Sequence, residues 1–78
     1  MKENKRNYPV ITITEKGEDF IESGNKWVYE NEIISYSKEH ENGDIVDVLS
    51  KKGKYLGTGF ISDVSKIRVR IFSKTVKR

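Results

Sequence analysis

The sequence predicts a small domain that is mainly β and contains one short α-helix. Short segments rich in β-branched residues alternate along the chain with turns that contain glycine and polar residues. Only the segment after the first such stretch changes to a helical period. Five short strands give too little area for two packed sheets. We therefore expect one strongly curved sheet or closed barrel, which also protects the strand edges.

The first half of the chain holds two of the expected strands and the helix. The segment 8–14 (YPVITIT) alternates β-branched residues, as a strand does. The segment 15–23 has acidic residues at its start and Gly24 beyond its end, which favours a helix of about two turns. An irregular corner is expected over 25–29, and a second strand over 32–37.

The second half predicts strands joined by tight turns. A β-branched strand is expected over 45–50, and the turn at 51–53 (KKG) leads into a strand over 54–61. Glycine in that turn fits a hairpin residue with positive φ. Gly57 and Gly59 would weaken a flat strand, so they indicate a bulge or barrel corner where the chain packs closely.

The last expected strand, 67–73, alternates apolar residues with cations. Successive side chains of a strand point to opposite faces, so one face is buried and the other is cationic. Cations two residues apart lie about 6.6 Å from each other, close to the phosphate spacing of a nucleic acid. We expect Ile67, Val69 and Ile71 to face inward, and Lys66, Arg68 and Arg70 to face solvent as a cationic ridge.

Charge is strongly sorted along the chain. Residues 1–47 carry 6 Lys or Arg and 11 Asp or Glu, a balance of −5. Residues 48–78 carry 9 Lys or Arg and one acid, a balance of +8. A basic surface of this kind favours a polyanionic partner. From the residues alone, a nucleic-acid-binding face and a plain solvated face are about equally open.

The chain offers no catalytic constellation. It has no cysteine, and its only histidine, His40, falls in a loop of charged residues where we expect it to be solvated. Glu18 and Glu22 share a helix face, but the pattern brings no opposed group to them, which favours a solvated face. The glycines of the 54–61 strand lack the lysine and helix of a phosphate loop. We expect no catalytic residue, cofactor or metal site in this chain.

The aromatic residues are expected to serve packing. Trp27 can stack on a base, but a lone tryptophan in a short domain is more often an anchor of the core or of a corner. Tyr29 and Tyr55 are interpreted in the same way.

Sequence features also bound the organisation of the chain. No apolar run approaches the roughly 20 residues that a membrane span needs, and the amino terminus lacks the apolar part of a secretory signal. A cytoplasmic protein is therefore expected. We divide the chain into a flexible segment 1–9, a folded domain 10–73 and a tail or linker 74–78.

Four motifs, in this order, give the chain a resemblance to a known family. They are the helix ending in Gly24 with Trp27-Val28-Tyr29, the Gly43-Asp44 strand start, the Gly53 turn into Leu56-Gly57-Thr58-Gly59, and Ser65-Lys66-Ile67-Arg68-Val69-Arg70. Together they resemble the amino-terminal PUA domain of the bacterial S-adenosylmethionine-dependent ribosomal-RNA cytosine methyltransferases. Where that family usually has a His-Pro pair, this chain has Asn25-Lys26.

The resemblance implies a PUA-like pseudobarrel of five to six strands with one short helix, serving as an RNA-binding module. The family's S-adenosylmethionine chemistry lies in a carboxy-terminal domain. This chain is therefore expected to be the recognition module of a longer enzyme, without activity of its own. The implied partners are ribosomal RNA and that methyltransferase domain.

The resemblance also implies where RNA is bound, because related PUA domains contact RNA with the helix and neighbouring strands. Combined with the cationic ridge and the preceding hairpin, it gives seven candidate RNA-binding residues, with Arg68 first. They are Arg68, Arg70, Lys66, Lys26, Lys16, Asn25 and Lys54. A second interpretation stays open, in which the domain is a protein-interaction or structural module. It then docks against its own catalytic domain without direct RNA contact.

Overall fold

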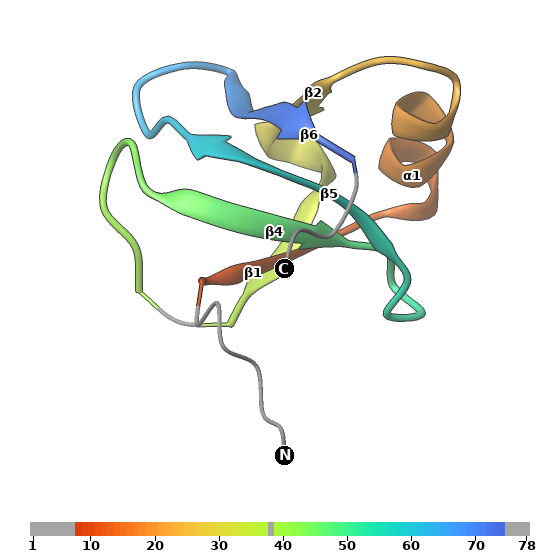
Figure 1. The fold of residues 1–78 in the computed structure, drawn as a ribbon, viewed down its shortest axis with the longest axis horizontal. Coiled ribbons are helices and arrows are strands. Elements are labelled where there is room, and N and C mark those ends of the chain that lie inside the picture. Colours follow the sequence, from red (N-terminus) through yellow and green to blue (C-terminus); the bar gives the residue numbers. More distant parts are fainter. Residues whose placement is uncertain (1–7, 38, 75–78) are drawn as a thin grey trace.

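The computed structural model describes residues 8–37 and 39–74, which form one curled sheet with a helix packed against it (Figure 1). The sequence-based expectations for residues 1–7 and 75–78 lie outside this part of the chain. Within it, the strands follow the order β2-β6-β5-β4-β1-β3. The bounds are β1 (Val10–Ile13), α1 (Glu15–Glu22), β2 (Trp27–Tyr29), the 3-10 helix η1 (Glu30–Glu32), β3 (Ile33–Tyr36), β4 (Ile45–Leu49), β5 (Tyr55–Ile61) and β6 (Ile67–Ser73).

The pairing of the strands makes the curl. β1 pairs in parallel with β4 and antiparallel with β3. β4, β5, β6 and β2 then continue the sheet through antiparallel ladders. Four of the five ladders contain a register shift, and such bulges bend a strand and increase its twist. The strongly curved sheet that the sequence predicts follows from these bends.

α1 begins at a capping threonine. The hydroxyl of Thr14 accepts a hydrogen bond from the Gly17 N–H at 3.0 Å, as an N-cap residue does. Beyond the other end, Gly24 adopts φ +111°, which a residue with a side chain rarely does. The helix predicted over 15–23 is thus confirmed. The described residues contain no helix long and apolar enough to cross a membrane.

The core lies inside the curl of the sheet and is made mainly of branched aliphatic residues. Burying each such side chain contributes about 1.5–3 kcal/mol. β6 supplies two of them, Val69 and Ile71, as its alternation predicts, while Ile67 is only half-buried. The buried cluster is Ile11, Ile13, Ile21, Val28, Val46, Val48, Leu56, Ile61, Val69 and Ile71.

Gly59 lies where β6 passes closest to β5. A Cβ atom at this position would stand 2.2 Å from the carbonyl oxygen of Arg70. The ladder register also shifts between Thr58 and Gly59, so that Phe72 has no partner in β5. The bulge predicted from the glycines of this strand is confirmed, and it requires a residue without a side chain.

The segment 25–29 is not the irregular corner that the sequence predicts. It contains β2, which pairs with β6, and the Ile71 N–H donates to the Lys26 carbonyl at 2.8 Å. The partner strand lies far away in the sequence, so the local pattern cannot reveal the pairing. β2 is also an edge of the sheet, and α1 lies near its free side.

Candidate nucleic-acid interface

An open groove of about 540 Å³ runs between α1 and the segment formed by β2 and η1. β2 is an edge strand, and no other strand in residues 8–37 and 39–74 pairs with this side of it. The groove is lined by Lys16, Gly17, Asp19, Phe20, Ser23, Trp27, Val28, Tyr29, Asn31 and Glu32.

Three aromatic side chains dominate the groove. Phe20, Trp27 and Tyr29 are 39%, 38% and 41% exposed, and the rings of Phe20 and Tyr29 meet edge to face at 6.1 Å. Trp27 and Tyr29 flank the buried Val28 on β2, which places both on the solvent side of the strand. Both rings line an accessible groove and lie outside the buried core, so they are not core residues; the packing role expected for Trp27 and Tyr29 stays a prediction.

Three of the predicted cations lie around these rings. Lys16 lines the groove, Lys26 precedes Trp27, and Arg70 stands directly opposite Trp27 in the β2–β6 ladder. All three are exposed, and no ion pair within the described residues involves them. The groove thus combines aromatic faces with cations that are free to meet an anion.

The groove also contains two carboxylates. Glu32 accepts a short hydrogen bond from the hydroxyl of Thr14, which ties it to the start of α1. Asp19 lies on the helix side. The lining itself thus has one lysine and two carboxylates, and the additional positive charge comes from Lys26 and Arg70, which are not lining residues but neighbour Trp27 along the chain and across the ladder.

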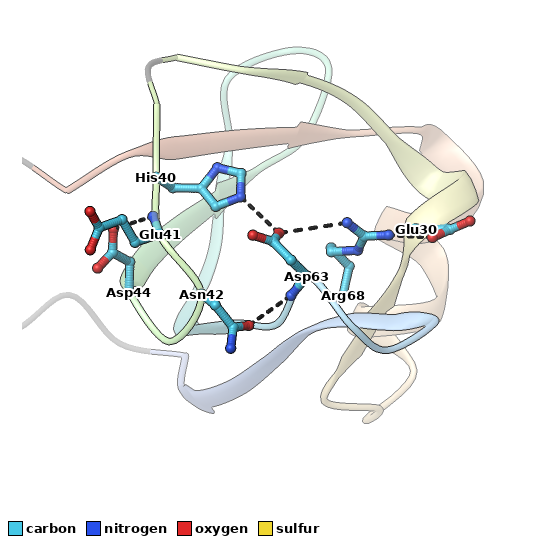
Figure 2. A network of polar contacts seen from close by, with 7 residues as sticks. All are labelled: Glu30, His40, Glu41, Asn42, Asp44, Asp63 and Arg68. Carbon is cyan, nitrogen blue, oxygen red and sulfur yellow. Dashed lines mark hydrogen bonds and ion pairs between the residues drawn. The ribbon is translucent and has the colours of Figure 1, made fainter.

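Arg68 does not project into solvent as the cationic ridge predicts. Its side chain is only 20% exposed, and its guanidinium pairs with the Glu30 carboxylate and lies 3.6 Å from Asp63 Oδ1 (Figure 2). The expected ridge is wrong at this position, whereas Lys66 and Arg70 are exposed as predicted. Whether Arg68 contacts RNA stays a prediction.

A bulge explains the different setting of Arg68. Val28 faces Val69 and Tyr29 faces Ile67, so Arg68 is the extra residue of the β2–β6 ladder. A bulged residue leaves the strict alternation of a strand, which re-aims its side chain. The carboxylate of Glu30, just beyond β2, then lies within reach.

His40 belongs to the same network, and the expectation that it is solvated is wrong. Its side chain is mostly covered, stacks on Tyr36 at 4.9 Å and meets Asp63 Oδ1 at 3.0 Å through Nε2 (Figure 2). The side-chain carbonyl of Asn42 also accepts from the Asp63 N–H at 2.8 Å. These contacts join the loop before β4 to the loop before β6, so we assign them a structural role.

Two further predicted residues have partners within the chain. Asn25 donates from Nδ2 to the Phe20 carbonyl at 2.9 Å, which satisfies a carbonyl near the end of α1. Lys54 Nζ lies 2.5 Å from the Glu22 carboxylate, and this hydrogen bond raises the pKa of Lys54 above its ordinary value. Both residues therefore have a structural task in addition to any contact with RNA.

The sequence interpretation selected none of the three aromatic residues Phe20, Trp27 and Tyr29 as site residues. A signal was present in the helix, because Phe20 and Ile21 are adjacent and only one of them can face the core. Ile21 takes the core position. The larger ring then lies on the groove side.

Comparison with known proteins gives this architecture a family. The PUA-like domain family matches residues 11–74. The chain belongs to the PUA-like domain family. The expected class, a small, mainly β PUA-like pseudobarrel with one helix, is confirmed, with six strands in the described residues.

The curated relatives of this PUA-like domain are much longer proteins. It is 28% identical over 71 residues to the ribosomal RNA large subunit methyltransferase I of Salmonella arizonae, covering 88% of this chain and 18% of that protein. It is 40% identical over 47 residues to the protein of the same name from Alteromonas mediterranea, covering 60% of this chain and 12% of that protein. The ribosomal RNA large subunit methyltransferase of Deinococcus radiodurans is 26% identical over 61 residues, covering 78% of this chain and 15% of that protein. The chain spans less than a fifth of the length of these relatives.

A solved structure shares the fold. A conserved PUA domain protein from Thermoplasma acidophilum superposes with a TM-score of 0.71 at 22% identity. The match covers 88% of this chain and 50% of that one.

Proposed function

We propose that this PUA-like domain binds RNA, and that the groove between α1 and β2 is its principal contact. One observation carries the proposal. Phe20, Trp27 and Tyr29 gather half-exposed in one groove, beside cations that have no ion pair in the described part of the chain. RNA-binding proteins recognise unpaired nucleotides by stacking bases on aromatic rings and neutralising phosphates with Lys and Arg.

The roles of the predicted residues differ in this proposal. Lys16, Lys26 and Arg70 meet phosphates beside the groove, and Lys66, whose carbonyl accepts from the Glu30 N–H just beyond β2, adds a further charge. The carboxylates around Arg68 and the Glu22 partner of Lys54 compete with a phosphate, so these two contribute less. With few free cations, affinity should be weak and should fall as salt rises.

The RNA is ribosomal in this proposal, and the domain presents it to a methyltransferase domain of the same polypeptide. Support comes from relatives named ribosomal RNA large subunit methyltransferases, of which this chain matches 12–18%. The domain then supplies recognition. Methyl transfer and the expected S-adenosylmethionine belong to the remaining part of such an enzyme.

Trp27 provides the test, because it is the only tryptophan of the chain and lines the groove. Structured RNA with an unpaired loop should quench its fluorescence, and heparin, an anion without bases, should not. Tyr29→Ala should weaken RNA binding about tenfold, since stacking on one ring contributes about 1–3 kcal/mol. Ile34→Ala is the matched control, because Ile34 is 50% exposed, at least as much as Tyr29, but lies on β3, at the opposite edge of the sheet.

Each outcome of this titration is decisive. The groove would be rejected as the contact if RNA binds without changing Trp27 fluorescence and the Tyr29→Ala variant binds RNA as tightly as the wild type. Absence of RNA binding at both low and high salt would reject the proposal. It would favour the second interpretation, in which the domain docks against its own catalytic domain.

A further inference from the structure

Besides the three rings of the groove, a pair of exposed aromatic rings lies on the outer face of the sheet. Phe60 on β5 and Phe72 on β6 are 50% and 54% exposed, and their ring centroids are 4.8 Å apart with the planes tilted by 41°. Phe72 is the extra residue of the β5–β6 ladder, and the bulge places its ring beside Phe60. Neither ring belongs to the buried core, so packing within the core does not explain their position.

The pair is continuous with the groove. Arg70 faces Trp27 in the β2–β6 ladder and Phe60 in the β5–β6 ladder. Residues directly opposite in a ladder share a face of the sheet, so Trp27, Arg70 and Phe60 form one row across three strands. Neighbouring strands are about 4.8 Å apart, which places Trp27 and Phe60 roughly 10 Å from each other with a cation between them.

We propose that this row, with Phe72, is a track for single-stranded RNA that leaves the groove. One base stacks on Trp27, the phosphate chain passes over Arg70, and the following bases stack on Phe60 and Phe72. The inference rests on the proposed RNA-binding function and extends it from a groove to the outer face of β5 and β6. It also assigns the substrate class, an unpaired strand longer than the groove itself can hold.

Charge favours a nucleic acid over a protein on this face. β5 and β6 contain no acidic residue. Two carboxylates beside β6, those of Glu30 and Asp63, are engaged by Arg68. Arg70 faces solvent and has no ion pair with any residue that the structure describes. Sheet surfaces hold single-stranded RNA by stacking bases on aromatic side chains and by following the backbone with positive charge.

The test compares two lengths of oligouridine, one of about four nucleotides and one of about ten, by quenching of Trp27 fluorescence. The double variant Phe60→Leu/Phe72→Leu keeps apolar bulk but removes both rings. The wild-type domain should bind the longer oligonucleotide at least about tenfold more tightly than the shorter one. The double variant should lose about tenfold in affinity for the longer oligonucleotide and leave the shorter one unchanged. Ile34→Ala should change neither.

Three results would overturn the inference. If the wild type and the double variant bind the longer oligonucleotide equally, the track is rejected, whereas the groove can still be the RNA contact. Loss of concentration-dependent self-association in the double variant, with RNA affinity unchanged, would make this face a protein contact. Failure of the wild type to bind either oligonucleotide would reject the inference, and the titration with structured RNA would then decide the proposed function separately. The single variants Phe60→Leu and Phe72→Leu give the same comparison if the double variant does not fold.

Discussion

The guanidinium of Arg68 pairs with the carboxylate of Glu30, 38 positions earlier in the chain, just beyond the end of β2. Asp63 stands on the other side of the same guanidinium, 3.6 Å from Nη1. Because the side chain is four-fifths covered, this contact joins the β2–η1 junction to the loop before β6. Arg68 is therefore placed as a stabilising residue, a role that its alternating sequence context does not reveal.

Arg68→Ala should destabilise the domain by about 1–2 kcal/mol, because it leaves the Glu30 carboxylate without its partner and removes one of two contacts of Asp63, which keeps His40. Partial exposure of these carboxylates reduces the loss. Urea unfolding followed by Trp27 fluorescence measures this difference. Arg70→Ala is the matched control on the same strand. Arg70 is exposed and unpaired within the described residues, so it should change stability by less than about 0.5 kcal/mol. Equal effects of the two variants would show that the Glu30 contact contributes nothing measurable.

Gly59→Ala should be among the most damaging single changes, costing about 3 kcal/mol or more or preventing folding. The added Cβ would lie 2.2 Å from a backbone oxygen of β6, and a paired strand cannot move away cheaply. At Gly57 the nearest atom is Ile71 Cγ2 at 2.8 Å, and the nearest backbone atom, the carbonyl oxygen of Ser73, is farther away at 3.1 Å. Gly57→Ala should therefore cost less. Thermal unfolding of both variants gives the order, and the reverse order would contradict the close approach at Gly59.

Thr14→Ala should cost about 1–2 kcal/mol, because it removes the acceptor of the Gly17 N–H and the donor to Glu32. Thr14→Ser keeps the hydroxyl and should stay within about 0.5 kcal/mol of wild type. Chemical denaturation with far-ultraviolet circular dichroism measures both. A serine variant as unstable as the alanine variant would assign the effect to the lost methyl group.

Arg70→Ala should weaken RNA binding to a similar extent for different sequences and lower the slope of log affinity against log salt by about 1. The reason is that a phosphate-neutralising cation acts without regard to base identity. Lys54→Ala should leave the slope nearly unchanged, since Lys54 already pairs with Glu22. RNA titrations at several salt concentrations measure the slopes. A larger change for Lys54 than for Arg70 would place RNA on the β4–β5 hairpin instead.

Much of the fold could be predicted from the sequence because its signals are local. β4, β5 and β6 each have a strand period and are joined by turn residues. Gly53 has a positive φ, as predicted, with a value of +91°. The helix has its cap and its terminal glycine. β2 was missed because three residues carry too little pattern, and only the pairing with β6 makes them a strand.

The candidate site was predictable only in part. The exposure of Lys66 and Arg70 follows from the alternation of β6, and their side chains lie as that alternation predicts. The aromatic groove was not predictable in the same way, since Phe20 and Tyr29 belong to elements that meet only when α1 folds onto β2.

The amino-acid sequence was enough to predict the class of the domain, the order of most elements and the face on which the core residues of each strand lie. These features depend on backbone periodicity and turn conformation, which are set by neighbouring residues. Tertiary structure decided which cations are free. Arg68 and Arg70 are equivalent in the sequence pattern, yet a bulge and a distant carboxylate cover the first and leave the second exposed. Coulomb attraction depends on distance in space, and that distance is set only when β2 and β6 come together.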